Sequence, residues 1–167
     1  MRAYLLVSLM IASVSVKADC TNRYILSSKP VEAYVDYSDG TLLDLETGLM
    51  WQKCELGKSG ELCEQGSASM LSWKDALDQV NNNTQYGYSD WRLPNVKELN
   101  SLIDVSCENP PINDQVFINA SNINLWSSTP SILTASSAKE AWAMMNFGML
   151  RPIAKDTLLG VRLVRDY

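Results

Sequence analysis

The most informative absence in this sequence is histidine, which does not occur among its 167 residues. There is therefore no imidazole to act as general base for a serine or cysteine nucleophile, and none to bind zinc. The sequence also lacks a Gly-x-Ser-x-Gly elbow and a Ser-x-x-Lys motif in a suitable context, and no spacing singles out two of its 19 acidic residues as a hydrolase pair. These absences favour a protein that is not an enzyme and carries no cofactor.

A second absence is that of long apolar runs, since nothing after the N-terminal stretch approaches the roughly twenty apolar residues of a membrane-spanning helix. The stretch Leu5 to Val16 is itself short; it follows the positively charged Arg2, and Val16-Lys17-Ala18 comes at its end. This arrangement is typical of a signal peptide. We therefore expect residues 1–18 to be removed and residues 19–167 to form one domain, exported without membrane insertion to the periplasm, the outer surface or the medium.

Positive charge is scarce, with 14 Lys and Arg against 19 Asp and Glu. Arg2 and Lys17 lie in the expected signal peptide, so the mature chain keeps 12 basic residues and a net charge of −7. Long-range repulsion therefore disfavours nucleic acid, anionic lipid and sulfated polysaccharide as partners. With 46% hydrophobic and 20% charged residues, the composition is that of an ordinary globular protein.

Cysteine is infrequent but even in number, and Cys20, Cys54, Cys63 and Cys107 all lie in the mature chain. An even count in an exported protein predicts disulfides, and four cysteines allow three pairings. Loop closure costs least between near neighbours, which favours Cys54–Cys63 and leaves Cys20–Cys107 as the second bond. A thiolate zinc site is not expected, because no Cys-x-x-Cys spacing is present.

The apolar pattern predicts two helices between groups of strands. Ser72 can cap a first helix, and Asn95 with Glu98 three residues later is typical of a capping box that begins a second one. Residues 19–35 show no clear period and are expected to form an extended lead-in. Strands are expected at residues 41–45, 49–52, 125–128, 141–147, 149–153 and 159–165. A hairpin, two helices and a run of strands define an α+β fold with an antiparallel sheet.

Three groups of residues carry a combined pattern. They are Gly48-Leu49-Met50-Trp51-Gln52-Lys53-Cys54; Gly87-Tyr88-Ser89-Asp90-Trp91-Arg92-Leu93-Pro94-Asn95 with Lys97-Glu98-Leu99; and Leu125-Trp126-Ser127-Ser128-Thr129-Pro130 with Ala141-Trp142 and Val161-Arg162-Leu163-Val164-Arg165. In order and spacing they resemble the DUF1566 family, also named for the C-terminal domain of a Legionella collagen-like adhesin, over about residues 36–165. The resemblance implies a C-type-lectin-like fold, related in shape to the formylglycine-generating enzyme domain, in exported bacterial proteins associated with adhesion or glycan binding.

Two activities found on such folds are not supported by the residues. Calcium-dependent C-type lectins bind sugar through Glu-Pro-Asn or Gln-Pro-Asp followed by Trp-Asn-Asp; these motifs are missing, and Glu108-Asn109-Pro110 has the composition in the wrong order. The formylglycine-generating enzyme uses a reactive cysteine pair with copper, whereas each cysteine here has a structural explanation. Neither calcium-bridged sugar binding nor oxidase activity is therefore expected.

The candidate ligand-binding residues are Trp126, Ser127, Ser128, Thr129 and Trp142. An indole face can stack on the apolar face of a pyranose ring while neighbouring hydroxyls bind its rim, so these residues could form a sugar platform. The competing interpretation is a β-strand with Trp126 pointing inward, and it is favoured because tryptophan is usually well buried.

The candidate calcium ligands are Asp36, Asp39 and Asp44, which lie around Gly40. Their spacing does not match an EF-hand. Asp and Gly are favoured at turns for local reasons, so a turn with solvated acids is the preferred interpretation.

The block Asp90-Trp91-Arg92 concentrates a charge pair and an indole in front of the second predicted helix. We interpret it structurally, with Trp91 in the core and Asp90 and Arg92 holding the loop by charge-assisted hydrogen bonds.

The sequence therefore predicts an exported, non-catalytic binding module for a glycan or a protein at the cell surface. A second class is a structural or assembly subunit of an envelope or extracellular complex, which should expose a contiguous apolar patch of several hundred square ångströms. A third class is a divergent enzyme of the formylglycine-generating-enzyme-like fold, which should gather acids in a closed pocket.

Overall fold

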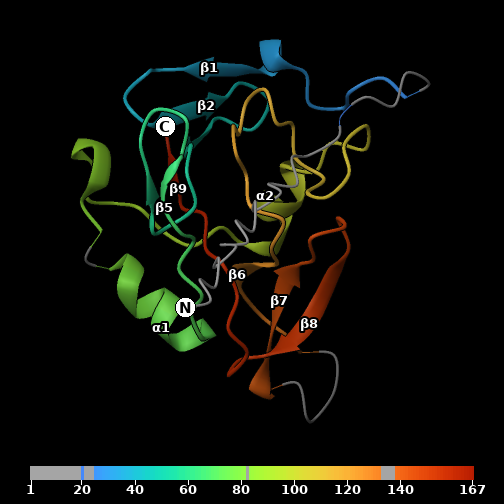
Figure 1. Cartoon of the computed structure of the whole chain (residues 1–167). Helices are drawn as coiled ribbons and strands as arrows, with labels where there is room; N and C mark the ends of the chain where they lie inside the picture. Colours follow the sequence, from blue (N-terminus) through green and yellow to red (C-terminus); the bar gives the residue numbers. More distant parts are fainter. Residues whose placement is uncertain (1–19, 21–24, 82, 133–137) are drawn as a thin grey trace, which may run out of the picture.

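The computed structural model describes residue 20 and residues 25–81, 83–132 and 138–167 (Figure 1). The expected signal peptide, residues 1–18, lies outside the described residues. The elements in chain order are the 3-10 helix η1 (Val31–Ala33), β1 (Tyr34–Asp36), β2 (Thr41–Asp44), β3 (Leu49–Gln52), β4 (Lys58–Ser59), β5 (Gln65–Gly66), α1 (Trp73–Val80), η2 (Gln85–Gly87), α2 (Val96–Ser101), β6 (Leu125–Pro130), β7 (Glu140–Met144), β8 (Leu150–Ala154) and β9 (Val164–Asp166). The described chain is thus an α+β fold with antiparallel strand pairs and two α-helices, as predicted.

The largest sheet has four strands in the order β1-β2-β3-β9. The β2–β3 hairpin closes because Asp44 Oδ1 accepts hydrogen bonds from the backbone N–H groups of Glu46 and Thr47, and Gly48 adopts a left-handed φ of 68°. Two expectations are corrected here. The lead-in contributes β1, because it finds a partner in β2, and the last strand is Val164–Asp166 rather than 159–165.

The expected single sheet is divided, because β6, β7 and β8 form a second, three-stranded sheet and β4 and β5 a small ribbon. The β7–β8 hairpin turns at Gly148, which has φ 87°. After β8 the chain runs back past β6, where Gly160 forms a parallel bridge with Leu125. Strand β9 then pairs with β3 in the four-stranded sheet. In Figure 1 the four-stranded sheet lies at the top, the three-stranded sheet at the lower right and α2 between them.

Both helices start at the residues that the sequence indicated. The Ser72 hydroxyl accepts from the backbone N–H of Asp75 and caps α1. Asn95 and Glu98 form a complete capping box at the start of α2. These signals are local, so they are readable without knowledge of the rest of the fold.

Two apolar clusters form the core. The first joins the four-stranded sheet to α2, and its members include Tyr34, Trp51, Leu99, Leu102 and Phe117. The second joins α1 to the three-stranded sheet, and its members include Met50, Ala76, Val80, Trp91, Trp126, Val161 and Leu163. Adjacent residues of β6 face different clusters, since Leu125 belongs to the first and Trp126 to the second. Strand β6 is therefore covered on both faces.

The structure joins Cys54 to Cys63 and Cys20 to Cys107. This is the predicted pairing, in which loop closure favours Cys54–Cys63 and Cys20–Cys107 remains as the second bond. The longer bond spans 87 residues and ties the start of the described chain to the segment after α2. No helix among the described residues has the length and apolar character needed to cross a membrane.

Candidate functional site

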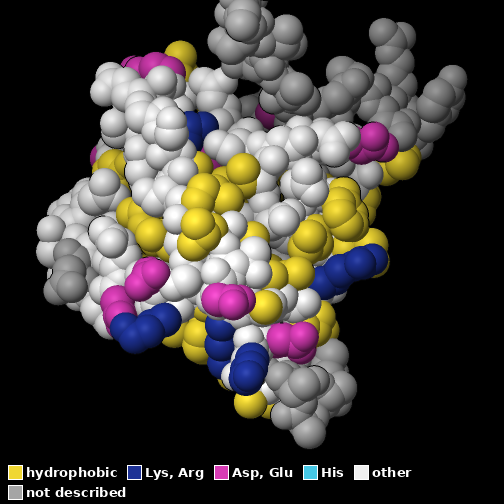
Figure 2. All heavy atoms as spheres, turned by 60° about the horizontal axis from the view of Figure 1, so that its bottom comes forward, with side chains coloured by type: hydrophobic (Ala, Val, Ile, Leu, Met, Phe, Trp, Pro, Cys, Tyr) yellow, Lys and Arg dark blue, Asp and Glu magenta, His cyan; other side chains and the backbone are white. Residues whose placement is uncertain are grey.

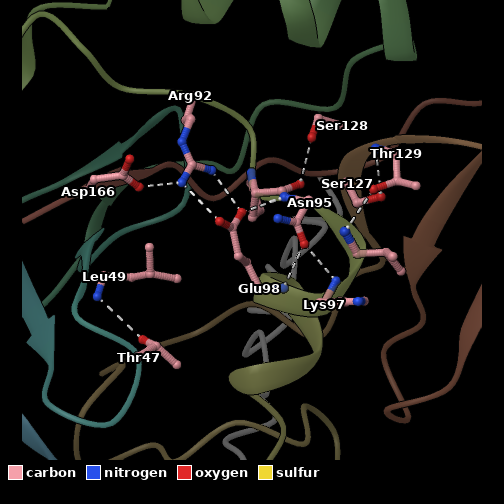
Figure 3. Close-up of polar contacts among 12 residues, drawn as sticks. Thr47, Leu49, Arg92, Asn95, Lys97, Glu98, Ser127, Ser128, Thr129 and Asp166 are labelled. Carbon is pink, nitrogen blue, oxygen red and sulfur yellow. Dashed lines mark hydrogen bonds and ion pairs between the residues drawn. The ribbon is translucent and has the colours of Figure 1, made fainter.

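The segment before α2 that contains Asp90-Trp91-Arg92, here called the signature segment, is organised around Arg92 (Figure 3). Its guanidinium binds Glu98 through two hydrogen bonds of 2.7 and 2.9 Å, and it also donates to Asp166 Oδ1 over 2.7 Å. The hydrogen bond to Glu98 is the main reason that the pKa of Arg92 is raised, so the guanidinium stays cationic. Backbone hydrogen bonds between Arg92 and Val164 complete the connection to β9.

The same segment fixes the start of α2. Glu98 Oε2 accepts from the backbone N–H of Asn95 over 2.7 Å, while Asn95 Oδ1 accepts from the backbone N–H groups of Lys97 and Glu98. Arg92 therefore clamps the residue that completes the helix cap. The segment is a structural junction between β9 and α2.

Asp90 and Arg92 both make charge-assisted hydrogen bonds, as expected, but not to each other. Asp90 Oδ1 accepts a 2.8 Å hydrogen bond from Arg165 Nε. Trp91 is buried, as predicted, and its indole N–H donates to the carbonyl of Gln85. The interaction with Arg165 joins two residues 75 positions apart, and no local spacing signals such a pair.

The candidate sugar platform on β6 has no accessible indole at its central residue, Trp126. Trp126 is completely buried, and its indole N–H donates to the carbonyl of Leu71 over 2.9 Å. Ser127 is buried as well, and its hydroxyl donates to the carbonyl of Trp142. The indole has no open face because cores lie on both sides of β6. The inward-pointing interpretation of Trp126 is the one that the structure shows.

The other hydroxyls of the expected platform hold the fold together, as Figure 3 shows. The backbone N–H of Ser128 donates to the carbonyl of Pro94 over 2.8 Å, and its hydroxyl makes a longer contact with the same oxygen. Thr129 Oγ1 accepts from the backbone N–H of Val96. These bonds fasten β6 to the first turn of α2. Trp142 is half-buried, and the flanking Ala141 and Ala143 are buried, so its side chain faces away from the second core cluster.

The three candidate calcium ligands are not brought together. Asp36 binds Lys53 Nζ over 2.6 Å, and Asp39 accepts from the backbone N–H and the hydroxyl of Thr41. Asp44 is buried and caps the β2–β3 turn. The described part of the chain contains no group of three His, Cys, Asp or Glu side chains placed to hold a metal ion.

An aromatic and charged surface lies beside the Arg92 junction, and the sequence analysis did not find it. The Arg165 guanidinium lies 4.3 Å from the centre of the Tyr88 ring and is held there by Asp90. Tyr88 packs edge-on against Trp91. Nothing in the spacing of these residues points to a common surface, because β9 is placed only by long-range strand pairing.

The structure defines this chain as a disulfide-bonded α+β domain whose signature segments build its framework. The family model of the Lcl C-terminal domain matches residues 40–165, and the chain belongs to that family. No curated protein matches the sequence. The family makes this an adhesin-related module, and its disulfides are consistent with an exported protein.

Proposed function

We propose that this protein is an exported bacterial binding module of the C-type-lectin-like type that acts in surface adhesion by recognising a carbohydrate or a protein, without catalysis of its own. The observation that carries the proposal is the family match over residues 40–165. It agrees with the chemistry of the signature residues, because Arg92, Glu98, Ser128 and Thr129 are already engaged in holding strands and helix together. Recognition is then left to exposed side chains around this framework.

An assembly subunit is the alternative, and it needs a contiguous apolar face. Exposed apolar side chains are present at the β7–β8 turn, where Phe147 is 52% and Met149 49% exposed. On the face that Figure 2 shows, however, hydrophobic side chains form separate patches divided by polar and charged groups. This face favours recognition of a polar ligand over permanent burial against another subunit.

The proposal is tested with the full chain, produced by export so that both disulfides form. The protein is applied to an array of glycans, in parallel with a pull-down from bacterial envelope and culture fractions. Saturable binding of a glycan or of one stoichiometric protein supports the proposal, and protein that has been reduced and alkylated serves as the unfolded control. A folded protein that binds neither glycan nor protein, or that converts a ligand into product, would overturn it.

A further inference from the structure

Two tyrosines from distant parts of the chain, Tyr37 and Tyr167, form an exposed pair near Tyr88. The rings of Tyr37 and Tyr167 are stacked, with centres 6.2 Å apart and planes 14° from parallel. A hydrogen bond of 3.0 Å joins their hydroxyls. Tyr37 is 39% and Tyr167 70% exposed, so much of the Tyr167 ring is open to solvent. Aromatic side chains of this size are usually buried, and an exposed, ordered pair therefore requires an explanation.

The pair is fixed by backbone contacts at both of its ends. The N–H of Tyr37 donates to the carbonyl of Thr41, and the N–H of Tyr167 donates to the carbonyl of Gly48. Because the rings and their hydroxyls are held before any ligand arrives, little conformational freedom would be lost on binding. Both tyrosines lie outside residues 40–165, the part of the chain that the family model matches.

The neighbouring groups are polar and belong to the same surface. Tyr167, Tyr88 and Asp39 all raise the pKa of Tyr37, and the largest cause is the hydrogen bond that Tyr37 donates to Tyr167. Asp39 and Asp90 are exposed carboxylates whose Oδ1 atoms accept from Thr41 and Arg165, so Oδ2 of each is the oxygen that would accept from a sugar hydroxyl. An open ring face matches the apolar C–H face of a pyranose, and exposed carboxylates on the same part of the protein could bind the hydroxyls of its polar rim.

The charges near the pair select against an anionic ligand. Arg92 is bound by Glu98 and Asp166, Arg165 by Asp90, and Lys53 by Asp36. Each of these cations is paired with an acid. An incoming sulfate or uronate would have to displace a carboxylate from its partner, and it would also meet the negative net charge of the chain.

We propose that Tyr37 and Tyr167 form the stacking platform of a binding site for a neutral saccharide, with Asp39 and Asp90 accepting hydrogen bonds from its hydroxyls. The proposal rests on the proposed recognition function and specifies its ligand class and its position. It requires no metal ion. The competing explanation is that the pair only covers the edge of the four-stranded sheet face that carries one cross-strand row of Val35, Leu43, Met50 and Arg165.

The test compares Tyr167→Ala, Tyr167→Phe and Tyr37→Ala with the full-length wild type on neutral, sulfated and uronate-containing glycans, with EDTA present. Phe147→Ala is the matched control, because it removes an exposed aromatic ring from the β7–β8 turn. We expect wild type and the control to bind a neutral glycan equally, and each alanine variant at the pair to lose at least about tenfold in affinity. Tyr167→Phe keeps the ring and should retain most of the binding.

Saturation-transfer NMR on the wild type keeps the test decisive where an alanine variant fails to fold. Transfer of saturation from the tyrosine ring protons to the sugar C–H protons of the wild type supports the platform. The folded Tyr167→Phe and Tyr37→Phe variants keep both rings, so they lose this transfer only if binding needs the hydroxyls. The platform is overturned if both alanine variants bind a neutral glycan as the wild type does. It is also overturned if the wild type binds only sulfated glycans or a protein. In both cases the proposed recognition function remains supported. A folded wild type that binds nothing would overturn both.

Discussion

Arg162 and Glu55, 107 positions apart in the sequence, form a completely buried ion pair with an N–O distance of 2.7 Å. The other end of the guanidinium donates to the carbonyls of Gln52 and Lys53, and its plane lies over the ring of Phe117. Burial alone would raise the pKa of Glu55, but the charges of Arg162 and Lys58 and the hydrogen bond from the Ser121 backbone together outweigh burial and lower the pKa. The pair connects the chain after β3 with the segment that leads into β9.

Glu55→Gln should destabilise the protein by about 3–5 kcal/mol, because it leaves the buried Arg162 without its counter-charge. Chemical denaturation of the oxidised protein in urea measures the loss. Lys74→Met is the matched control: it breaks an ion pair with Asp78 whose side chains are 81% and 61% exposed, and it should change stability by less than about 1 kcal/mol. Equal effects of the two substitutions would contradict the structural importance of the buried pair.

Asp104 should make the protein sensitive to acid. Its buried carboxylate accepts hydrogen bonds from Ser27, Ser28 and Ser106, and although desolvation raises its pKa, these bonds outweigh it and hold the pKa below the ordinary value of 3.8. A lowered folded-state pKa contributes stability that is present above 3.8 and is lost as the pH falls through the lower folded value. We expect Asp104→Asn to be less stable than the wild type at neutral pH. Its free energy of unfolding in urea should also fall less between pH 7 and pH 2.

The matched substitution for this acid-side test is Asp78→Asn, which alters an exposed carboxylate on α1. It should leave the difference in stability between neutral and acid pH nearly unchanged. If the wild type and Asp104→Asn lose the same unfolding free energy between pH 7 and pH 2, Asp104 does not contribute to the acid sensitivity.

Trp126→Ala should act on stability and not on ligand binding. Removing a fully buried indole leaves a cavity and an unpaired Leu71 carbonyl, with an expected cost of about 3–5 kcal/mol. Trp142→Ala, at a half-buried position, should cost less. Thermal and urea unfolding measure both losses. A Trp126→Ala variant of wild-type stability that no longer binds its ligand would restore the sugar platform on β6.

The phenol of Tyr37 should ionise at a higher pH than an ordinary tyrosine, because its hydrogen bond to Tyr167 and its partial burial raise the pKa above 10.0. A raised folded-state value means that the contact stabilises the protein below pH 10.0 and is lost as the pH rises through the higher value. NMR of ring-labelled tyrosine follows the titration residue by residue. In Tyr167→Phe the Tyr37 pKa should fall towards the ordinary value, and an unchanged titration would argue against the hydroxyl contact.

The sequence by itself determined the features that depend on near neighbours. The cap of α1 at Ser72, the box of Asn95 and Glu98, the turn at Gly48 and the Cys54–Cys63 loop each join groups only a few positions apart. The family motifs also identified the framework, because they contain the residues that build it. Such signals are readable because a short chain segment adopts the same capped or turned geometry in many folds.

Only the tertiary structure decided which distant groups meet. Asp90 binds Arg165 rather than the nearby Arg92, and Tyr37 contacts Tyr167, which lies 130 positions away. Both contacts form because strand pairing places β9 beside β3 and β1 beside β2. Strand alternation likewise could not show that Trp126 is inaccessible. In a strand packed on both faces the usual difference between an inner and an outer side disappears, and burial then depends on the second layer that the fold supplies.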